Sequence, residues 1–138
     1  MSAHTVNSPP SAAFHNVVLT GACGGLGQAL ARQLMGQGAK VALLGMNQEV
    51  LVQLALLAPT RTRTYILDVS DTQAMQAVAR DWVTFAGPPD LVIANAGVAS
   101  GFDTAQAADL TVMRRMLEIN VLGPATTFQP FVHAWQHV

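Results

Sequence analysis

A short apolar segment that ends in a glycine-rich turn constrains this chain more than any other feature. Residues 17–20, Val-Val-Leu-Thr, predict a strand that is buried on both faces. Gly21, Gly25 and Gly27 form the turn, and leucines at four-residue spacing predict a helix directly after it. The N-terminus of a helix presents unpaired N–H groups, and glycine lets an anion approach them because it has no Cβ. The turn therefore predicts a phosphate-binding site, and hence a bound nucleotide.

The rest of the chain alternates strands and helices, which is typical of a parallel sheet with helices on both faces. Further apolar segments predict three strands, at residues 41–44, 64–67 and 91–94. Helical patterns begin near Leu26, Asn47, Ser70 and Pro124, and a further one follows Asp103, with Leu110, Met113 and Leu117. Ser70 has the spacing of a capping box with Gln73, and Leu57 is expected to face inward. Right-handed crossovers then predict an α/β fold, a doubly wound parallel sheet of order 3-2-1-4, truncated after four strands.

The composition argues against several function classes. Hydrophobic residues make up 51% of the chain and charged residues 11%, as in a membrane protein or a soluble one with an extensive buried or interface surface. No uninterrupted apolar run approaches the roughly 20 residues of a membrane span. The net charge is −1 with no basic stripe, so we expect no nucleic-acid partner. The N-terminus lacks the pattern of a secretory signal, and a cytoplasmic location is therefore expected.

Four motifs in order resemble the short-chain dehydrogenase/reductase family, and together they extend from about residue 16 to the end of the chain. The stretch from Thr20 to Gly27 matches the family's Thr-Gly-x-x-x-Gly-x-Gly fingerprint at every fixed position. Asp68 and Val69 close the third strand, where the family places an Asp near the adenine ring. The other two motifs are the Asn-Ala-Gly that closes the fourth strand, Asn95-Ala96-Gly97, and the family's helix asparagine, Asn120.

The resemblance implies a Rossmann-type fold and an NAD(P)-dependent oxidoreductase that transfers hydride between nicotinamide and a carbonyl or alcohol carbon of a small molecule. Asn120 belongs to the family's catalytic tetrad of Asn, Ser, Tyr and Lys, and Asn is a mediocre helix former, which suggests a local irregularity there. Asp68 could instead only end a strand, and Asn95 could be an ordinary turn residue. The residues expected to bind the cofactor are Thr20, Gly21, Cys23, Gly25, Leu26, Gly27, Met46, Asp68, Val69, Asn95, Ala96 and Gly97.

The other three tetrad residues have no match in this chain. The family's base is a Tyr with a Lys four residues later, whereas the one Tyr, Tyr65, and the one Lys, Lys40, stand in the wrong order and 25 positions apart. The Ser is expected after a fifth strand, beyond the end of the chain. We therefore expect residues 16–138 to be an incomplete cofactor-binding domain that alone turns nothing over. Residues 1–15, rich in Ser, Ala, Asn and Pro, are expected to form a disordered tail. The alternative is a non-catalytic dinucleotide-binding module; a methyltransferase would not explain the last two motifs.

Cofactor choice and the remaining reactive side chains depend on weaker signals. Gly45-Met46-Asn47 follow the second strand and contain neither the acid typical of NAD enzymes nor the Arg typical of NADP enzymes. This favours NADP over NAD, because no acid there repels its phosphate. Cys23 is interpreted as a small turn residue rather than a redox sensor. His133 and His137 have metal-ligand spacing but no third ligand nearby, so no metal is expected. An apolar last helix and an unblocked fourth strand predict a homo-oligomer.

Overall fold

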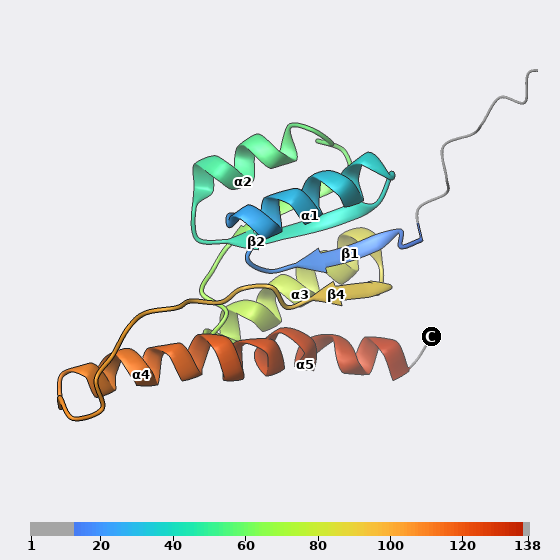
Figure 1. Ribbon diagram of the computed structural model, residues 1–138. Coiled ribbons are helices and arrows are strands. Elements are labelled where there is room, and N and C mark those ends of the chain that lie inside the picture. The colour runs from blue at the N-terminus through green and yellow to red at the C-terminus, as the bar shows by residue number, and fades with distance from the viewer. Residues whose placement is uncertain (1–12, 137–138) are drawn as a thin grey trace, which may run out of the picture.

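The computed structural model describes residues 13–136, so most of the expected N-terminal tail lies outside the described residues (Figure 1). The strands are β1 (Asn16–Leu19), β2 (Lys40–Gly45), β3 (Thr62–Ile66) and β4 (Leu91–Ile93). The helices are α1 (Gly25–Gly36), α2 (Gln48–Ala55), α3 (Thr72–Ala86), α4 (Asp109–Leu117), the π-helical turn η1 (Glu118–Leu122) and α5 (Gly123–Gln136). Strands and helices alternate up to β4, as the sequence pattern predicts.

The four strands form one parallel sheet in the order β3-β2-β1-β4, which confirms the predicted fold class and strand order. Val18 of β1 is paired with Ala42 on one side and with Val92 on the other. The chain moves outward from β1 to β3 and then crosses back to β4, so the order reverses beside β1. Because the strands are parallel, their carboxyl ends share one edge of the sheet, where the loops that leave β1 and β4 are neighbours.

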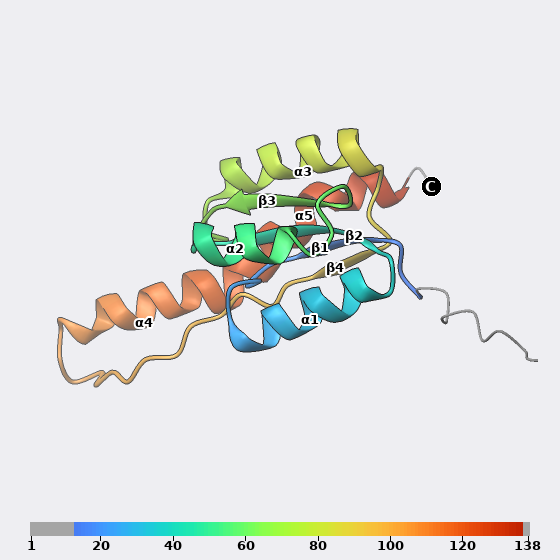
Figure 2. The same cartoon turned by 90° about the horizontal axis from the view of Figure 1, so that it is seen from above.

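Side chains of the central strands alternate between two hydrophobic cores. Val17 and Leu19 pack with α1 and α2 on one face of the sheet, and Val18 packs with α3 and α5 on the other. Figure 1 shows α1 and α2 above the sheet and α3 and α5 below it. In Figure 2, α4 and the loop before it extend past the carboxyl ends of the strands. The sheet is thus covered on both faces, and its carboxyl edge is left to the loops.

Two local predictions about helix ends are wrong. The capping box at Ser70 does not form, because Asp71 caps α3 by accepting a hydrogen bond from the N–H of Ala74 at 3.0 Å. The helix α2 ends before Leu57, which therefore lies in the following turn with 54% of its surface exposed. The displaced cap leaves the Ser70 hydroxyl free for a different contact, described below.

The helices α4 and α5 lie end to end, joined by η1, which contains Asn120 (Figure 1). The predicted local irregularity is therefore a π-helical turn, a feature that occurs frequently at functional sites. None of the residues of α4 is buried, so packing alone holds this helix weakly against the sheet. Among residues 13–136, no helix combines the length and the apolar character needed to cross a membrane.

Candidate functional site

The turn after β1 is bound to the segment that leaves β4. The almost fully buried hydroxyl of Thr20 accepts hydrogen bonds from the N–H groups of Asn95 and Ala96 at 3.0 and 3.1 Å. The side-chain amide of Asn95 donates to the carbonyl oxygen of Gly21 at 3.2 Å. Gly21 has a φ of +66°, and a Cβ there would lie 2.8 Å from the backbone of Ala96. These contacts hold the two loops together where the strand order reverses.

The N-terminus of α1 is open to an anion. Gly24 caps the helix without a side-chain hydrogen bond, and no described residue accepts a hydrogen bond from the N–H of Gly25, Leu26 or Gly27. A Cβ on Gly25 would have no atom within 4 Å, so the space beside these groups is free. The first turn of α1 carries no acidic residue. A phosphate group therefore fits here, since free N–H groups and the positive end of the helix dipole both favour negative charge.

Gly27 determines how closely α1 packs against the turn. A Cβ at this position would overlap the carbonyl oxygen of Gly21 and lie 2.7 Å from its carbonyl carbon. Only glycine fits this contact without a shift of the backbone. Gly27 therefore keeps the N-terminus of α1 close to the end of β1.

A cavity of about 200 Å³ opens at the carboxyl ends of the strands, beside this turn. The segments that leave all four strands contribute to its walls, together with Ile119 of η1. Thr20 is buried beneath the turn and does not itself line the cavity. Gly25, Leu26 and Gly27 form the start of α1 next to the cavity. The predicted site residues that line the cavity are Gly21, Cys23, Met46, Asp68, Val69, Asn95, Ala96 and Gly97. The fold thus brings together residues from separate parts of the sequence.

Cys23 and the end of β2 form one side of the cavity. The Cys23 thiol donates to the carbonyl oxygen of Asn47, with 3.5 Å between sulfur and oxygen, and a Cβ on Gly45 would overlap the sulfur. The Met46 side chain is 69% exposed, and the Asn47 amide oxygen caps α2 by accepting from the N–H of Val50. Within the described residues, no charged side chain lines this side of the cavity.

Asp68 follows β3, and its carboxylate is held from two sides. Oδ1 accepts hydrogen bonds from the N–H and the hydroxyl of Ser70 at 2.9 and 2.7 Å, and Oδ2 accepts from the guanidinium of Arg115 on α4. Partial burial raises the pKa of Asp68, but the Ser70 hydrogen bonds and the Arg115 charge outweigh it, so the pKa lies below its ordinary value. Val69 is buried beside Gly123, where a Cβ would lie 2.8 Å from a valine methyl group.

Asn120 uses its side chain to fix the loop after β4. Its Oδ1 accepts from the N–H of Val98 at 2.8 Å, and its Nδ2 donates to the carbonyl oxygen of Val98 at 2.7 Å. A Cβ on Gly97 would lie 3.4 Å from Oδ1. The amide of Asn120 therefore ties η1 to Val98, directly after the Asn-Ala-Gly segment at the edge of the cavity.

Tyr65 and Lys40 lie away from the cavity. The Tyr65 hydroxyl donates to Oδ2 of Asp81 at 2.6 Å. Burial, and to a smaller extent this hydrogen bond, raises the pKa of Tyr65 well above its ordinary value. The ammonium group of Lys40, at the start of β2, lies 5.9 Å from the ring centre of Phe85. Neither side chain lines the cavity.

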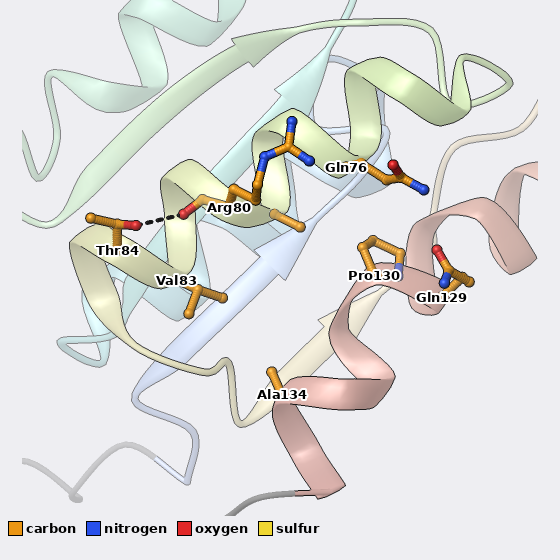
Figure 3. A pocket seen from close by; sticks show the side chains of 8 residues that line it. Gln76, Arg80, Val83, Thr84, Gln129, Pro130 and Ala134 are labelled. Atoms are coloured by element: carbon orange, nitrogen blue, oxygen red, sulfur yellow. Dashed lines mark hydrogen bonds between the residues drawn. The ribbon is translucent and has the colours of Figure 1, made fainter.

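A larger hollow of about 530 Å³ lies between α3 and α5 (Figure 3). Arg80, Val83 and Pro130 contribute to its walls, and the Thr84 hydroxyl donates to the carbonyl oxygen of Arg80 at 2.8 Å. None of the predicted site residues lines this hollow. The smaller cavity is therefore the candidate site.

Sequence reasoning missed several residues of the candidate site. Val98 and Ile119 line the cavity, and Arg115 reaches Asp68 from α4, which is 47 positions further along the chain. No local pattern marks Arg115, because its partner Asp68 lies far away in the sequence. Ser70 was identified, but as a helix cap rather than as a partner of Asp68.

The comparisons with known proteins agree with this Rossmann-like α/β fold. Residues 15–137 match the family described as short chain dehydrogenase. The chain therefore belongs to the short-chain dehydrogenase/reductase family, whose matched members are oxidoreductases.

Individual relatives match the chain over most of its length. Sulfoacetaldehyde reductase 2 of Chromohalobacter salexigens is 34% identical over 109 residues, which are 78% of this chain and 43% of that protein. A short-chain dehydrogenase structure from Streptomyces avermitilis superposes with a TM-score of 0.81 at 26% identity, covering 89% of this chain and 45% of that one. The structure of an NAD⁺-bound xylitol dehydrogenase gives 0.76 at 29% identity, covering 85% and 46%. The chain thus spans less than half the length of these three relatives.

Proposed function

We propose that this chain is the dinucleotide-binding part of an NAD(P)-dependent oxidoreductase. The observation that carries the proposal is the open N-terminus of α1 beside a cavity at the carboxyl edge of the sheet. In doubly wound sheets, ligands bind at this edge, next to the point where the strand order reverses. When bound, the nicotinamide donates or accepts the hydride. The chain's own residues bind and orient the dinucleotide.

The residues around the cavity suit separate parts of a dinucleotide. The free N–H groups of Gly25 and Leu26 would hold the pyrophosphate. The Asp68 carboxylate would accept a hydrogen bond from the adenine amino group, and the Met46 segment would lie beside the ribose. The Asn-Ala-Gly segment is held by Thr20, and Val98 directly after it is held by Asn120; this segment would form the wall nearest the nicotinamide half.

The proposed substrate is a small molecule with a carbonyl or alcohol group. The names of the relatives support this class, since sulfoacetaldehyde is an aldehyde and xylitol is an alcohol. Asn120 is the residue of this chain proposed for the catalytic set. Its side chain is engaged by Val98, so we assign its role to the backbone carbonyl, which would hold a water molecule.

We propose that the 138-residue chain binds the dinucleotide but does not turn over substrate. Tyr65 and Lys40 lie outside the cavity and are not spaced to act together, so the tetrad has no base in this chain. The same observation favours a second candidate function, a non-catalytic dinucleotide-binding module. A longer polypeptide that contains this chain decides between them by its reductase activity on a broad panel of aldehydes and ketones. Activity with NADPH or NADH favours the enzyme, and none favours the module.

Titration of the chain with NADP⁺ and NAD⁺ tests the binding function and its preference. We expect both dinucleotides to raise the melting temperature, with NADP⁺ giving the larger shift, because none of the three residues from Gly45 to Asn47 at the end of β2 carries a carboxylate that would repel the 2′-phosphate. The Met46→Asp variant should reverse the preference, whereas Gln53→Asp, which adds the same charge on the exposed side of α2, should leave it unchanged. No stabilisation by either dinucleotide at millimolar concentration would refute the proposed function.

We also propose that the chain forms homo-oligomers through α5 and the free edge of β4. On the described part of the chain, β4 pairs only with β1. The large apolar side chains exposed on η1 and α5 are Val121, Leu122, Phe128, Val132 and Trp135. Apolar surface of this kind favours association. Sedimentation should show a mass that rises with protein concentration, and a single monomeric species at high concentration would contradict the proposal.

A further inference from the structure

A closed ring of hydrogen bonds surrounds the carboxylate of Asp68. The Arg115 guanidinium donates through one nitrogen to Oδ2 of Asp68 and through the other to the hydroxyl oxygen of Ser70, at 3.0 Å. The same hydroxyl donates to Oδ1 of Asp68 at 2.7 Å. Each of the three side chains therefore contacts the other two. Glu118 lies at the edge of the ring: its Oε2 is 3.5 Å from the Arg115 nitrogen that donates to Ser70.

The ring determines which acceptor sites of Asp68 remain free. An ionised carboxylate offers about four lone-pair sites, two on each oxygen. The Ser70 N–H and hydroxyl occupy both sites on Oδ1, and Arg115 occupies one on Oδ2. One site on Oδ2 is left, and the side chain lines the cavity with 27% of its surface exposed. A hydrogen-bond donor on a ligand in the cavity therefore meets a carboxylate that is fixed in orientation. Only one acceptor site of this carboxylate, on Oδ2, is free.

The ring also links α4 to the cavity. Because none of the residues of α4 is buried, Arg115 is a main polar contact between this helix and the loop after β3. Its guanidinium is fully charged, and the hydrogen bond from Arg115 helps to hold the pKa of Asp68 below its ordinary value after burial has raised it. Arg114, the next residue along, forms no ion pair with any described residue. Arg115 thus differs from its neighbour in position and not in charge.

We propose that Arg115 is a positioning residue which, by its contacts with both Asp68 and Ser70, aims the free acceptor site of Asp68 at the 6-amino group of adenine. The inference rests on the proposed function, because it needs an adenine dinucleotide in the cavity. Hypoxanthine carries a carbonyl oxygen in place of that amino group, so a fixed carboxylate repels it. The ring therefore makes the site selective for adenine over hypoxanthine. If Arg115 served only to tether α4, its loss would weaken binding of both bases equally.

Calorimetric titration with ADP and with inosine diphosphate tests the proposal on the whole chain. We expect wild type to bind ADP about tenfold more tightly, the effect of one hydrogen bond to a charged group. Arg115→Met should reduce this ratio to about twofold, because Oδ2 then loses the contact that directs it and has two free acceptor sites, although Ser70 still holds Oδ1. Arg115→Lys, which keeps the charge, should restore part of the ratio, and the matched control Arg114→Met should leave it unchanged.

The outcomes separate this proposal from the proposed function. If wild type binds neither nucleotide, nor NADP⁺, the dinucleotide site itself is wrong. If wild type prefers ADP and Arg115→Met keeps the full preference, the positioning role is overturned while the site stands. Equal affinity of wild type for both nucleotides also overturns it. Should Arg115→Met fail to fold, Ser70→Ala opens the same ring from the α3 side and must lower the ratio in the same direction.

Discussion

An alanine at position 27 should destabilise the whole domain, with a loss of about 3 kcal/mol in the free energy of unfolding. The added Cβ overlaps the carbonyl oxygen of Gly21 and lies within 3 Å of two further backbone atoms. Because the obstacle is backbone, no side-chain rotation relieves it, and α1 must move away from β1. Chemical denaturation followed by circular dichroism measures the change.

The matched control for Gly27→Ala is Gly36→Ala at the other end of the same helix. A Cβ on Gly36 would have no atom within 4 Å, and alanine is the better helix former, so this variant should be as stable as wild type or slightly more stable. Equal stability of Gly27→Ala and Gly36→Ala would show that α1 does not pack against the turn as described.

An alanine at position 25 should weaken dinucleotide binding by about tenfold or more while leaving the fold intact. A Cβ on Gly25 meets no protein atom within 4 Å, so it costs no stability. The methyl group instead occupies the free space beside the N–H groups of Gly25, Leu26 and Gly27, where the pyrophosphate is proposed to lie. Calorimetric titration with NADP⁺ measures the loss, and the melting temperature checks the fold.

Gly36→Ala again supplies the control, because it makes the same change on the same helix away from the cavity. Its affinity for NADP⁺ should equal that of wild type. If Gly25→Ala also binds as tightly as wild type, then the pyrophosphate does not lie at the N-terminus of α1. The two positions 25 and 27 thus separate the two uses of glycine in one turn: space for a ligand and space for the backbone.

Most of the fold could be predicted because its signals are local. The alternation of apolar and helical segments and the right-handed crossovers were enough to predict the order β3-β2-β1-β4. The turn at Gly21 and the segment at Asn95 could each be identified from a motif, and the parallel sheet brings both to one edge. The π-helical turn was indicated only by an asparagine inside a helical pattern.

The parts that could not be predicted depend on competing or distant contacts. Ser70 and Asp71 are both good cap residues; Asp71 caps α3, while the Ser70 hydroxyl donates to Asp68 instead. Arg115 contacts Asp68 from α4, 47 positions further along the chain, so no local pattern links the two residues. Leu57 has the spacing of an inward-facing residue, but α2 ends before it.

Amide chemical-shift mapping by NMR during titration with NADP⁺ tests the central claim most directly. We expect the resonances of Gly25, Leu26 and Gly27 to shift most, together with those of residues 95–98, and the shifts to saturate as NADP⁺ is added. The resonances of residues around the α3–α5 hollow, such as Arg80 and Gln129, should not shift. Shifts confined to that hollow, or none at the start of α1 at saturating NADP⁺, would contradict a dinucleotide site at the glycine-rich turn.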